Sequence, residues 1–316
     1  MKSNHMKGNA ILLLTAFIWG MAFTAQLVGG GSVGTFTFNA TRFFLGAFVL
    51  VPTVMIFDRV NKNGRFLFSR TGITRTEWIG GALCGICLCV ATTLQQEGLM
   101  HIKEGATGKS AFITALYVLI VPIIGLILRR RVPLFHWIGI GVAIVGFFLL
   151  CIDFDSGFSS IGLGELLTLL CALSFSVHIW VISYFTPKVD GVRMSCIQFL
   201  TAAILSLPFS LIFERPTLAA LGSAALPILY AGLFSSGVAY TLQIIGQRYA
   251  KPATATVIMS LEAVFGALGG AVILGVIGGD RSQMLTLPQI GGAAIVLAAV
   301  LFVSLYKPHG KEQSDK

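Results

Sequence analysis

Charged residues are scarce in this 316-residue chain: they make up 11% of it, whereas hydrophobic residues make up 55%. So low a charge excludes an ordinary water-soluble domain, because polar side chains must cover the surface of such a domain. No long polar stretch remains that could form a soluble domain of its own. These shortages predict a protein that lies in a membrane.

Two motifs that would indicate other functions are also lacking. The chain has no HExxH arrangement and no nucleotide-binding loop. We therefore expect neither an enzyme nor a cofactor, and any accumulation of a substrate must draw on a gradient or on exchange. Nothing resembles a selectivity filter, although a channel, and a receptor or structural protein, stay open as alternatives.

What the chain has instead is a series of apolar segments, each near the length of about 20 residues that a spanning helix needs. They are continuous runs such as residues 117–128, unlike the alternating strands of a β-barrel. The sequence therefore predicts an all-α integral membrane protein with ten transmembrane helices. The segments are 8–28, 35–56, 76–98, 105–128, 134–152, 162–184, 191–213, 223–247, 252–276 and 286–306.

The net charge of +9 would suggest nucleic acid as the partner of a soluble protein, but the basic residues gather in alternate loops. This asymmetry predicts that both termini are cytoplasmic. We expect the first helix to remain uncleaved. We also expect the chain to lie in the cytoplasmic membrane and not to bind nucleic acid. The inner basic residues are then Lys2, Lys7, Arg59, Lys62, Arg65, Arg70, Arg75, Arg129, Arg130, Arg131, Lys188, Arg193, Arg248, Lys251, Lys307, Lys311 and Lys316, and the outer ones are Lys103, Arg215 and Arg281.

The chain repeats itself. The stretch VATTLQQEG at residues 90–98 returns as VAYTLQIIG at residues 238–246. Further matches keep the same order, so we interpret residues 1–155 and 156–316 as two copies of one five-helix unit. They set residues 39–52 on 195–208, Trp19 on Phe175, Ala106 and Thr107 on Ala253 and Thr254, and Ile138 and Gly139 on Ile290 and Gly291.

Each copy has five helices, which is an odd number. The second copy is therefore inserted in the membrane in the opposite orientation to the first. The loop charges agree, because Arg129, Arg130 and Arg131 in the first copy match Asp280 and Arg281 in the second. Inverted repeats around a site near the middle of the bilayer are a common construction of secondary transporters. The repeat therefore favours a transporter that works by alternating access.

Four stretches carry a resemblance to a known family: AFIWG at residues 16–20, Arg42 followed by Phe43 and Phe44, the paired VAxTLQ and SLEAVFGAL at residues 260–268. Together they resemble the drug/metabolite transporter superfamily, in particular its ten-helix EamA type. The resemblance implies a basket of ten helices around a central cavity that moves small metabolites. Ala263 stands where the family usually has proline after the glutamate, so the kink implied there lacks its proline.

Ionisable groups inside a bilayer are costly and mark candidate functional sites. Glu262 is a candidate for proton coupling or cation binding, because burial disfavours a charged carboxylate; the alternative is a structural pair with a basic neighbour or a helix end. Arg42 and Lys109 could bind an anionic or zwitterionic substrate. The alternatives are a structural role for Arg42 and, for Lys109, snorkelling to the outer surface or pairing with Glu97 or Glu104.

The repeated glutamines, Gln95 and Gln243, are candidates to hydrogen-bond substrate on the two halves of the pathway. The alternative is hydrogen bonding between helices alone, worth about 0.6 kcal/mol in membranes. Aromatic rings suit aromatic or cationic ligands, although packing and interfacial anchoring are the alternatives. The aromatic candidates are Trp19, Tyr117, Phe175 and His178, with Trp180 and Tyr184 read first as packing or anchoring residues.

Small side chains give weaker signals. Cys84, Cys87 and Cys89 invite a metal interpretation, but Cys84 and Cys89 lie on different faces of a helix, so we expect no metal site. Gly266 and Gly270 have GxxxG spacing, which permits close packing within the chain or a homodimer contact.

The sequence as a whole predicts a secondary active transporter, an exporter or exchanger of small organic metabolites such as amino acids. A carrier of organic cations or amines is the alternative, and a channel-like facilitator a more distant one. Protons or another ion would couple the transport.

Overall fold

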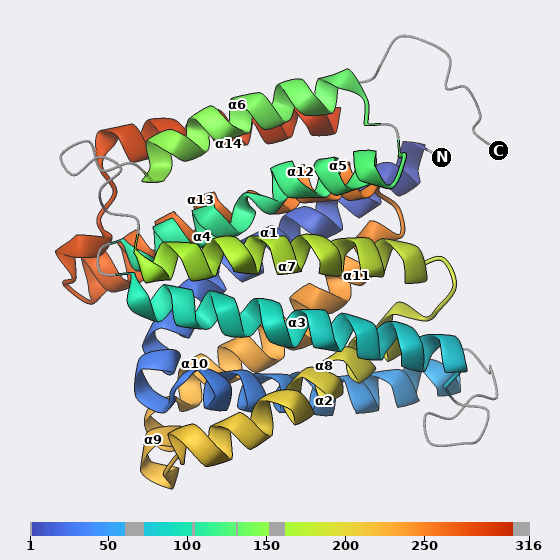
Figure 1. The fold of residues 1–316 in the computed structure, drawn as a ribbon, viewed down its shortest axis with the longest axis vertical. Helices are drawn as coiled ribbons and strands as arrows, with labels where there is room; N and C mark the ends of the chain where they lie inside the picture. The colour runs from blue at the N-terminus through green and yellow to red at the C-terminus, as the bar shows by residue number, and fades with distance from the viewer. Residues whose placement is uncertain (1, 61–72, 103–104, 131, 152–161, 306–316) are drawn as a thin grey trace.

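A computed structural model describes residues 2–60, 73–102, 105–130, 132–151 and 162–305, and every regular element in this part of the chain is a helix (Figure 1). The prediction of an all-helical chain is confirmed. In chain order the elements are α1 (Lys2–Val33), α2 (Thr35–Val60), α3 (Arg75–His101), α4 (Ala106–Ala115), α5 (Tyr117–Ile127), α6 (Leu134–Cys151), α7 (Leu163–Phe185), α8 (Gly191–Phe209), η2 (Ser210–Glu214), α9 (Leu218–Ser223), α10 (Ala225–Leu229), η3 (Tyr230–Tyr240), α11 (Thr241–Gln247), α12 (Pro252–Met259), α13 (Glu262–Gly269), η4 (Gly270–Ile277), η5 (Arg281–Gln283) and α14 (Leu287–Leu305).

Eight helical segments of the described chain are long and apolar enough to cross a membrane. Two shorter apolar helical stretches, Leu134–Gly146 in α6 and Leu287–Val303 in α14, lie where the sequence predicts the fifth and tenth spans. The ten-helix count itself stays a prediction. The eight segments are Met6–Val33, Thr35–Met55, Arg75–His101, Ala106–Ile127, Leu163–Phe185, Gly191–Glu214, Ala225–Gln247 and Pro252–Ile277.

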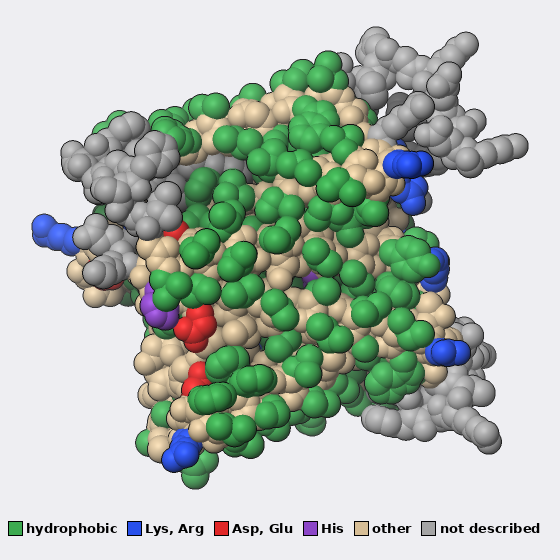
Figure 2. Space-filling model, viewed as in Figure 1, with side chains coloured by type: hydrophobic (Ala, Val, Ile, Leu, Met, Phe, Trp, Pro, Cys, Tyr) green, Lys and Arg blue, Asp and Glu red, His purple; other side chains and the backbone are tan. Residues whose placement is uncertain are grey.

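The outer faces of these helices are apolar. Phe48, Ile127 and Leu134 each expose about three-quarters of their surface, and Figure 2 shows hydrophobic side chains spread over the whole middle of the molecule. Lys and Arg side chains gather mainly along one end of the helices, at the right of the view, whereas Asp and Glu appear toward the other end. So much exposed apolar surface between two polar ends suits a bilayer and would be rare on a soluble monomer.

The helices pack in pairs that follow the sequence repeat. α3 packs on α7 and on α8; its match in the second copy, η3 with α11, packs on α1, and η3 also packs on α2. Helices that match one another also meet, since α2 packs on α8 and α6 packs on α14. Exchanging the two copies therefore reproduces the same set of neighbours.

Two spans are interrupted near, but not at, matching positions of the repeat. In span 106–127 the chain turns at Leu116, where the amides of Leu116 and Leu119 bond to carbonyls three residues earlier. In span 252–277 it turns at Ser260 and Leu261. The tighter bonding of a 3₁₀ turn separates α4 from α5 and α12 from α13.

The second interruption arises without proline. The hydroxyl of Ser260 donates to the carbonyl of Val257 at 2.7 Å, a side-chain bond that competes with the helical ladder and bends helices. The amide of Ala263 then bonds to the carbonyl of Ser260. The helix is therefore interrupted at Ser260 and Leu261, just before Ala263, the position where the resemblance implies a proline.

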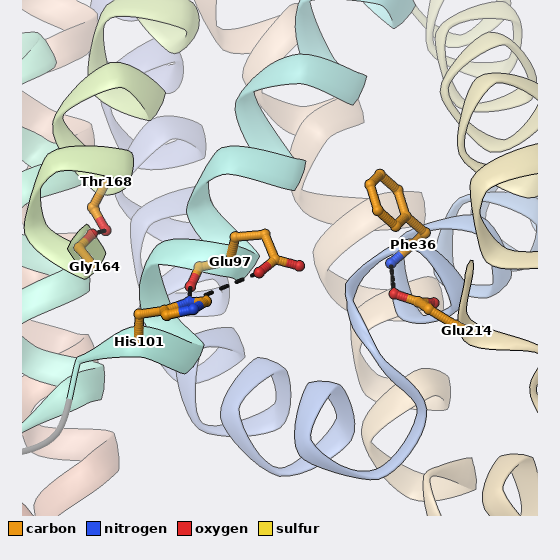
Figure 3. Close-up of polar contacts among 6 residues, drawn as sticks. All are labelled: Phe36, Glu97, His101, Gly164, Thr168 and Glu214. Atoms are coloured by element: carbon orange, nitrogen blue, oxygen red, sulfur yellow. Dashed lines mark hydrogen bonds and ion pairs between the residues drawn. The ribbon is translucent and has the colours of Figure 1, made fainter.

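Glu214 links the end of one copy's second helix to the start of the other's. Its carboxylate accepts hydrogen bonds from the backbone amides of Phe36, at 2.8 Å, and Thr37, at 2.6 Å. Figure 3 shows this carboxylate at the first turn of α2. A negative group at a helix N-terminus satisfies free amides and favours the helix dipole, so the contact stabilises the packing of α2 on η2 and α8.

Several predicted features lie outside the described residues. These are the inner basic residues Lys62, Arg65, Arg70, Arg131, Lys307, Lys311 and Lys316, the outer Lys103, the acidic Glu104 and the boundary between residues 155 and 156.

Close packing of α3 on α8 depends on Gly85, where an added Cβ would lie 2.5 Å from the Cβ of Thr201 and 2.6 Å from the carbonyl oxygen of Gln198. We expect Gly85→Ala to lower the free energy of unfolding by about 1–3 kcal/mol through overpacking. Gly141→Ala on α6, where nothing lies within 4 Å, is the matched control and gains helix propensity only. Thermal unfolding in detergent measures both, and equal melting temperatures would contradict this packing.

Candidate functional site

A buried cavity lies where the two copies meet, at the level of the two interrupted spans. Side chains from α1, α2, α3, α4, α5, α7, η3, α11, α12 and α13 line it, so both copies contribute. The lining residues are Trp19, Phe23, Gln26, Arg42, Gln95, Thr114, Tyr117, Phe175, Ile179, Ser235, Tyr240, Gln243, Met259 and Glu262.

The cavity is tight. The centre of a water molecule can occupy about 20 Å³ of it, little more than the about 10–15 Å³ that one water needs. A metabolite would require its walls to part.

Seven of the nine predicted site residues line this one cavity. They are Trp19, Arg42, Gln95, Tyr117, Phe175, Gln243 and Glu262. Lys109 and His178 do not line it. The structure thus brings together most of the candidates that the repeat and the intramembrane charges indicated, while their roles in binding stay predictions.

Arg42 is a buried cation that forms no ion pair within the described residues. Its Nε and Nη2 atoms are buried without a hydrogen-bond partner in that part of the chain. The guanidinium carbon lies 4.7 Å from the ring centroid of Phe43 and 5.5 Å from that of Phe38, distances that give cation–π attraction. Aromatic faces therefore support the charge on two sides, and its remaining N–H groups are free for an acceptor.

Glu262 is buried at the first position of α13, beside the hydroxyl of Tyr117. The Tyr117 hydroxyl and the Glu262 carboxyl group interact with each other, but the Tyr117 hydroxyl and Oε1 of Glu262 lack a hydrogen bond of good geometry within the described residues. Of the two structural alternatives, a pair with a basic neighbour does not occur among the described residues, whereas a helix end does lie at Glu262, the first residue of α13. A carboxyl group in this position can take up a proton or receive a donor from a ligand.

Aromatic rings form one wall of the cavity. Trp19 and Tyr240 pack with ring centroids 4.6 Å apart, and the indole N–H of Trp19 donates to the carbonyl of Ser235 at 3.3 Å. His178 lies behind this wall: its ring centroid is 6.2 Å from that of Tyr240, and its Nε2 is 3.1 Å from Oε1 of Gln198. Phe175 lines the cavity beside His178.

The two repeated glutamines meet at the same cavity. Nε2 of Gln95 donates to the hydroxyl of Thr114 at 3.2 Å. This is a hydrogen bond between helices, the predicted alternative to substrate binding. Oε1 of Gln243 is buried without a partner among the described residues. Gln243 therefore keeps an acceptor for a ligand, whereas Gln95 fixes α3 against α4.

The remaining candidates lie elsewhere. Lys109 is half-buried in α4, and Glu97, one of its two suggested partners, has its carboxylate 3.8 Å from Nδ1 of His101 (Figure 3). Trp180 donates to the carbonyl of Val121 at 3.0 Å, and Tyr184 is exposed, in line with packing and anchoring roles.

Sequence reasoning missed half of the lining, and Tyr240 is the most central omission. The signal was present, because Tyr240 replaces Thr92 inside the repeated stretch and is its only aromatic difference. The other missed residues are Phe23, Gln26, Thr114, Ile179, Ser235 and Met259.

Two patterns that suggest other chemistry do not form sites in the described chain. No group of three or more His, Cys, Asp or Glu residues lies close enough there to hold a metal ion. Residues 30–34 match Gly-x-Ser-x-Gly, a spacing that marks nucleophilic serines on a strand-to-helix turn. Ser32, however, is exposed at the end of α1, and its hydroxyl donates to the carbonyl of Val28 at 3.1 Å.

A buried charge without a partner lowers the stability of the fold. We therefore expect Arg42→Met, which keeps the length of the side chain but removes the charge, to raise the melting temperature in detergent by about 2 °C or more. Arg248→Met, at an exposed position, is the matched control and should leave it nearly unchanged. A clear loss of stability in Arg42→Met alone would instead support the structural role.

The comparisons with known proteins agree with this architecture. The model of the EamA-like transporter family matches the chain twice, at residues 6–152 and 162–305. An "Uncharacterized transporter" from Archaeoglobus fulgidus is 30% identical over 295 residues, which are 93% of this chain and 84% of that protein. A solved crystal structure shares the fold with a TM-score of 0.70 at 19% identity, covering 94% of this chain and 96% of the other. The chain belongs to the EamA-like transporter family, a family of the drug/metabolite transporter superfamily.

Proposed function

We propose that this chain is a secondary active transporter that moves small zwitterionic metabolites, amino acids first, across the cytoplasmic membrane by alternating access. The observation that carries the proposal is that Arg42 and Glu262, two groups of opposite charge, line the same buried cavity. A guanidinium fits the carboxylate of a zwitterion, and a carboxylate fits its ammonium group. Gln243 and the aromatic wall add an acceptor and an apolar surface.

Glu262 is also our candidate for proton coupling. In the empty site a proton on this carboxyl group would remove the free-energy cost of burying a negative charge. An ammonium group arriving from the substrate would favour the ionised form and displace that proton. Substrate and proton would then cross in opposite directions, as in an exporter that uses an inward proton gradient.

The proposal includes the arrangement in the membrane. We take α6 and α14 to cross the bilayer, which gives ten spans as two inverted copies, residues 1–155 and 156–316, with both termini cytoplasmic. The Lys and Arg side chains at one end of the helices support this orientation (Figure 2). Fusion of a fluorescent protein and of alkaline phosphatase to the C-terminus tests it; active phosphatase would reverse the orientation.

A carrier of organic cations or amines is the second candidate. The ring pair of Trp19 and Tyr240, together with Glu262, offers cation–π attraction and a counter-ion. Such a carrier would not need Arg42. A channel-like facilitator is less well supported, because the cavity leaves room for little more than a water molecule.

Transport into proteoliposomes tests the function. The purified protein is offered a panel of amino acids, amines and organic anions with and without a pH gradient. We expect saturable accumulation of a zwitterion only with the gradient, up to about tenfold per pH unit for each coupled proton. Glu262→Gln, which removes the titrating group, should abolish accumulation but retain exchange.

Arg42→Met separates the two substrate classes. Loss of transport in this variant supports a zwitterion, whereas unchanged transport of an amine supports the cation carrier. If no panel member moves saturably in the wild-type protein, the transporter assignment of this cavity fails.

A further inference from the structure

Each interrupted span begins with a threonine that bonds to a neighbouring helix of the same fold. Near the start of α4 the hydroxyl of Thr107 donates to Oε1 of Gln283 at 2.9 Å. Near the start of α12 the hydroxyl of Thr254 lies 2.9 Å from Nε2 of His136 and shares a hydrogen bond with it. Thr107 and Thr254 occupy matching positions in the sequence repeat, so the threonine of the contact recurs in both copies, with a different partner in each.

The two contacts lie at opposite ends of the molecule. Thr107 lies against Gly270, at the start of η4, where an added Cβ would collide with the threonine hydroxyl. Thr254 lies at the other end of the same span. About sixteen residues of helix separate Thr254 from Gly270, which is about 24 Å along the axis. Figure 1 likewise shows α4 beside α13 toward one end of the bundle and α5 beside α12 toward the other.

The cavity lies between them. Glu262 is about eight residues from Thr254 and about eight from Gly270, so it is about 12 Å from each contact along the span. The interruptions at Leu116 and at Ser260 also lie at the cavity. Each threonine therefore stands on a half-helix, α4 or α12, that extends from the cavity to one end of the protein.

Both contacts fix these half-helices to the fifth and tenth spans. Gln283 ends the short helix η5 that precedes α14, and His136 lies in the first turn of α6. α6 and α14 pack on each other, so they form a common support. Three of the four side chains, those of Thr107, Gln283 and His136, are buried, which protects the bonds from water.

We propose that Thr107 with Gln283, and Thr254 with His136, are two gate latches that control access to the cavity from opposite faces of the membrane. Release of the first latch lets α4 swing from its interruption and opens the cavity to one face. Release of the second lets α12 do the same for the other face. Both latches are formed in this structure, and the cavity between them is small. The inference rests on the alternating access of the proposed function but concerns residues outside the cavity.

Labelling of a single cysteine from each face tests the latches. The reporter is Ser235→Cys, which lines the cavity, in the full chain with its six native cysteines replaced. A membrane-impermeant thiol reagent is added to intact cells and, separately, to inverted vesicles, with no substrate present. Thr107→Val and Thr254→Val remove one latch each while keeping the shape of the side chain.

We expect Thr107→Val to speed labelling from one face only and Thr254→Val from the opposite face only. The expected factor is about threefold, which corresponds to one interhelical hydrogen bond of average strength in a membrane. Thr107→Ser and Thr254→Ser keep the hydroxyl and should restore the wild-type rates. Thr168→Val is the matched control, since this buried hydroxyl donates only to the carbonyl of Gly164 in its own helix, at 2.8 Å (Figure 3).

Labelling from the same face in both variants, or rates equal to those of the Thr168→Val control, would overturn the latches. Because no substrate is present, this result is independent of what the protein carries. Sided labelling without any transported substrate would retain the latches and remove the proposed function. Transport without sided labelling would support the proposed function and overturn the latches.

Discussion

The rest of this structure depends on one constraint: a guanidinium and a carboxyl group, Arg42 and Glu262, are buried inside a helical bundle, away from bulk water. Two aromatic faces support the cation, and a tyrosine hydroxyl lies beside the carboxyl group. Within the described chain neither group is neutralised by an ion pair. Buried charges without an ion pair lower the stability of the fold, but a cation and an anion in one cavity suit the binding of a ligand that carries both charges.

In the proposed mechanism of alternating access, the two-copy construction would let such a site be reached from either face. The cavity lies at the level where span 106–127 and span 252–277 are interrupted, and both interruptions are single 3₁₀ turns. Broken helices are tolerated at membrane depth where they line a cavity. The half-helices that leave the cavity toward opposite ends each carry a threonine hydrogen-bonded to a neighbouring helix: Thr107 to Gln283 of η5, and Thr254 to His136 of α6. The same local design thus serves both ends, as inverted repeats require.

Much of this could be predicted from the sequence. Runs of apolar residues give helices in a bilayer with little ambiguity. The intramembrane charges, the repeated glutamines and the aromatic candidates together marked seven of the residues that line the cavity. Lys109 and His178 show the limit, because position along a span does not say which face of the helix turns inward. The interruption at Ser260 depends on one side-chain hydrogen bond to the carbonyl of Val257. Tyr240 lines the cavity because it packs on Trp19, which is distant in the sequence. Sequence patterns did not predict either contact.

Counterflow tests the central claim, that one cavity is opened alternately to the two sides, most directly. Proteoliposomes are loaded with a high concentration of an unlabelled transported metabolite, and a trace of the labelled compound is added outside without any ion gradient. A carrier with alternating access returns with external substrate after releasing internal substrate, so the account predicts a transient overshoot of label inside. Monotonic filling to equilibrium would contradict it and indicate a continuous pathway.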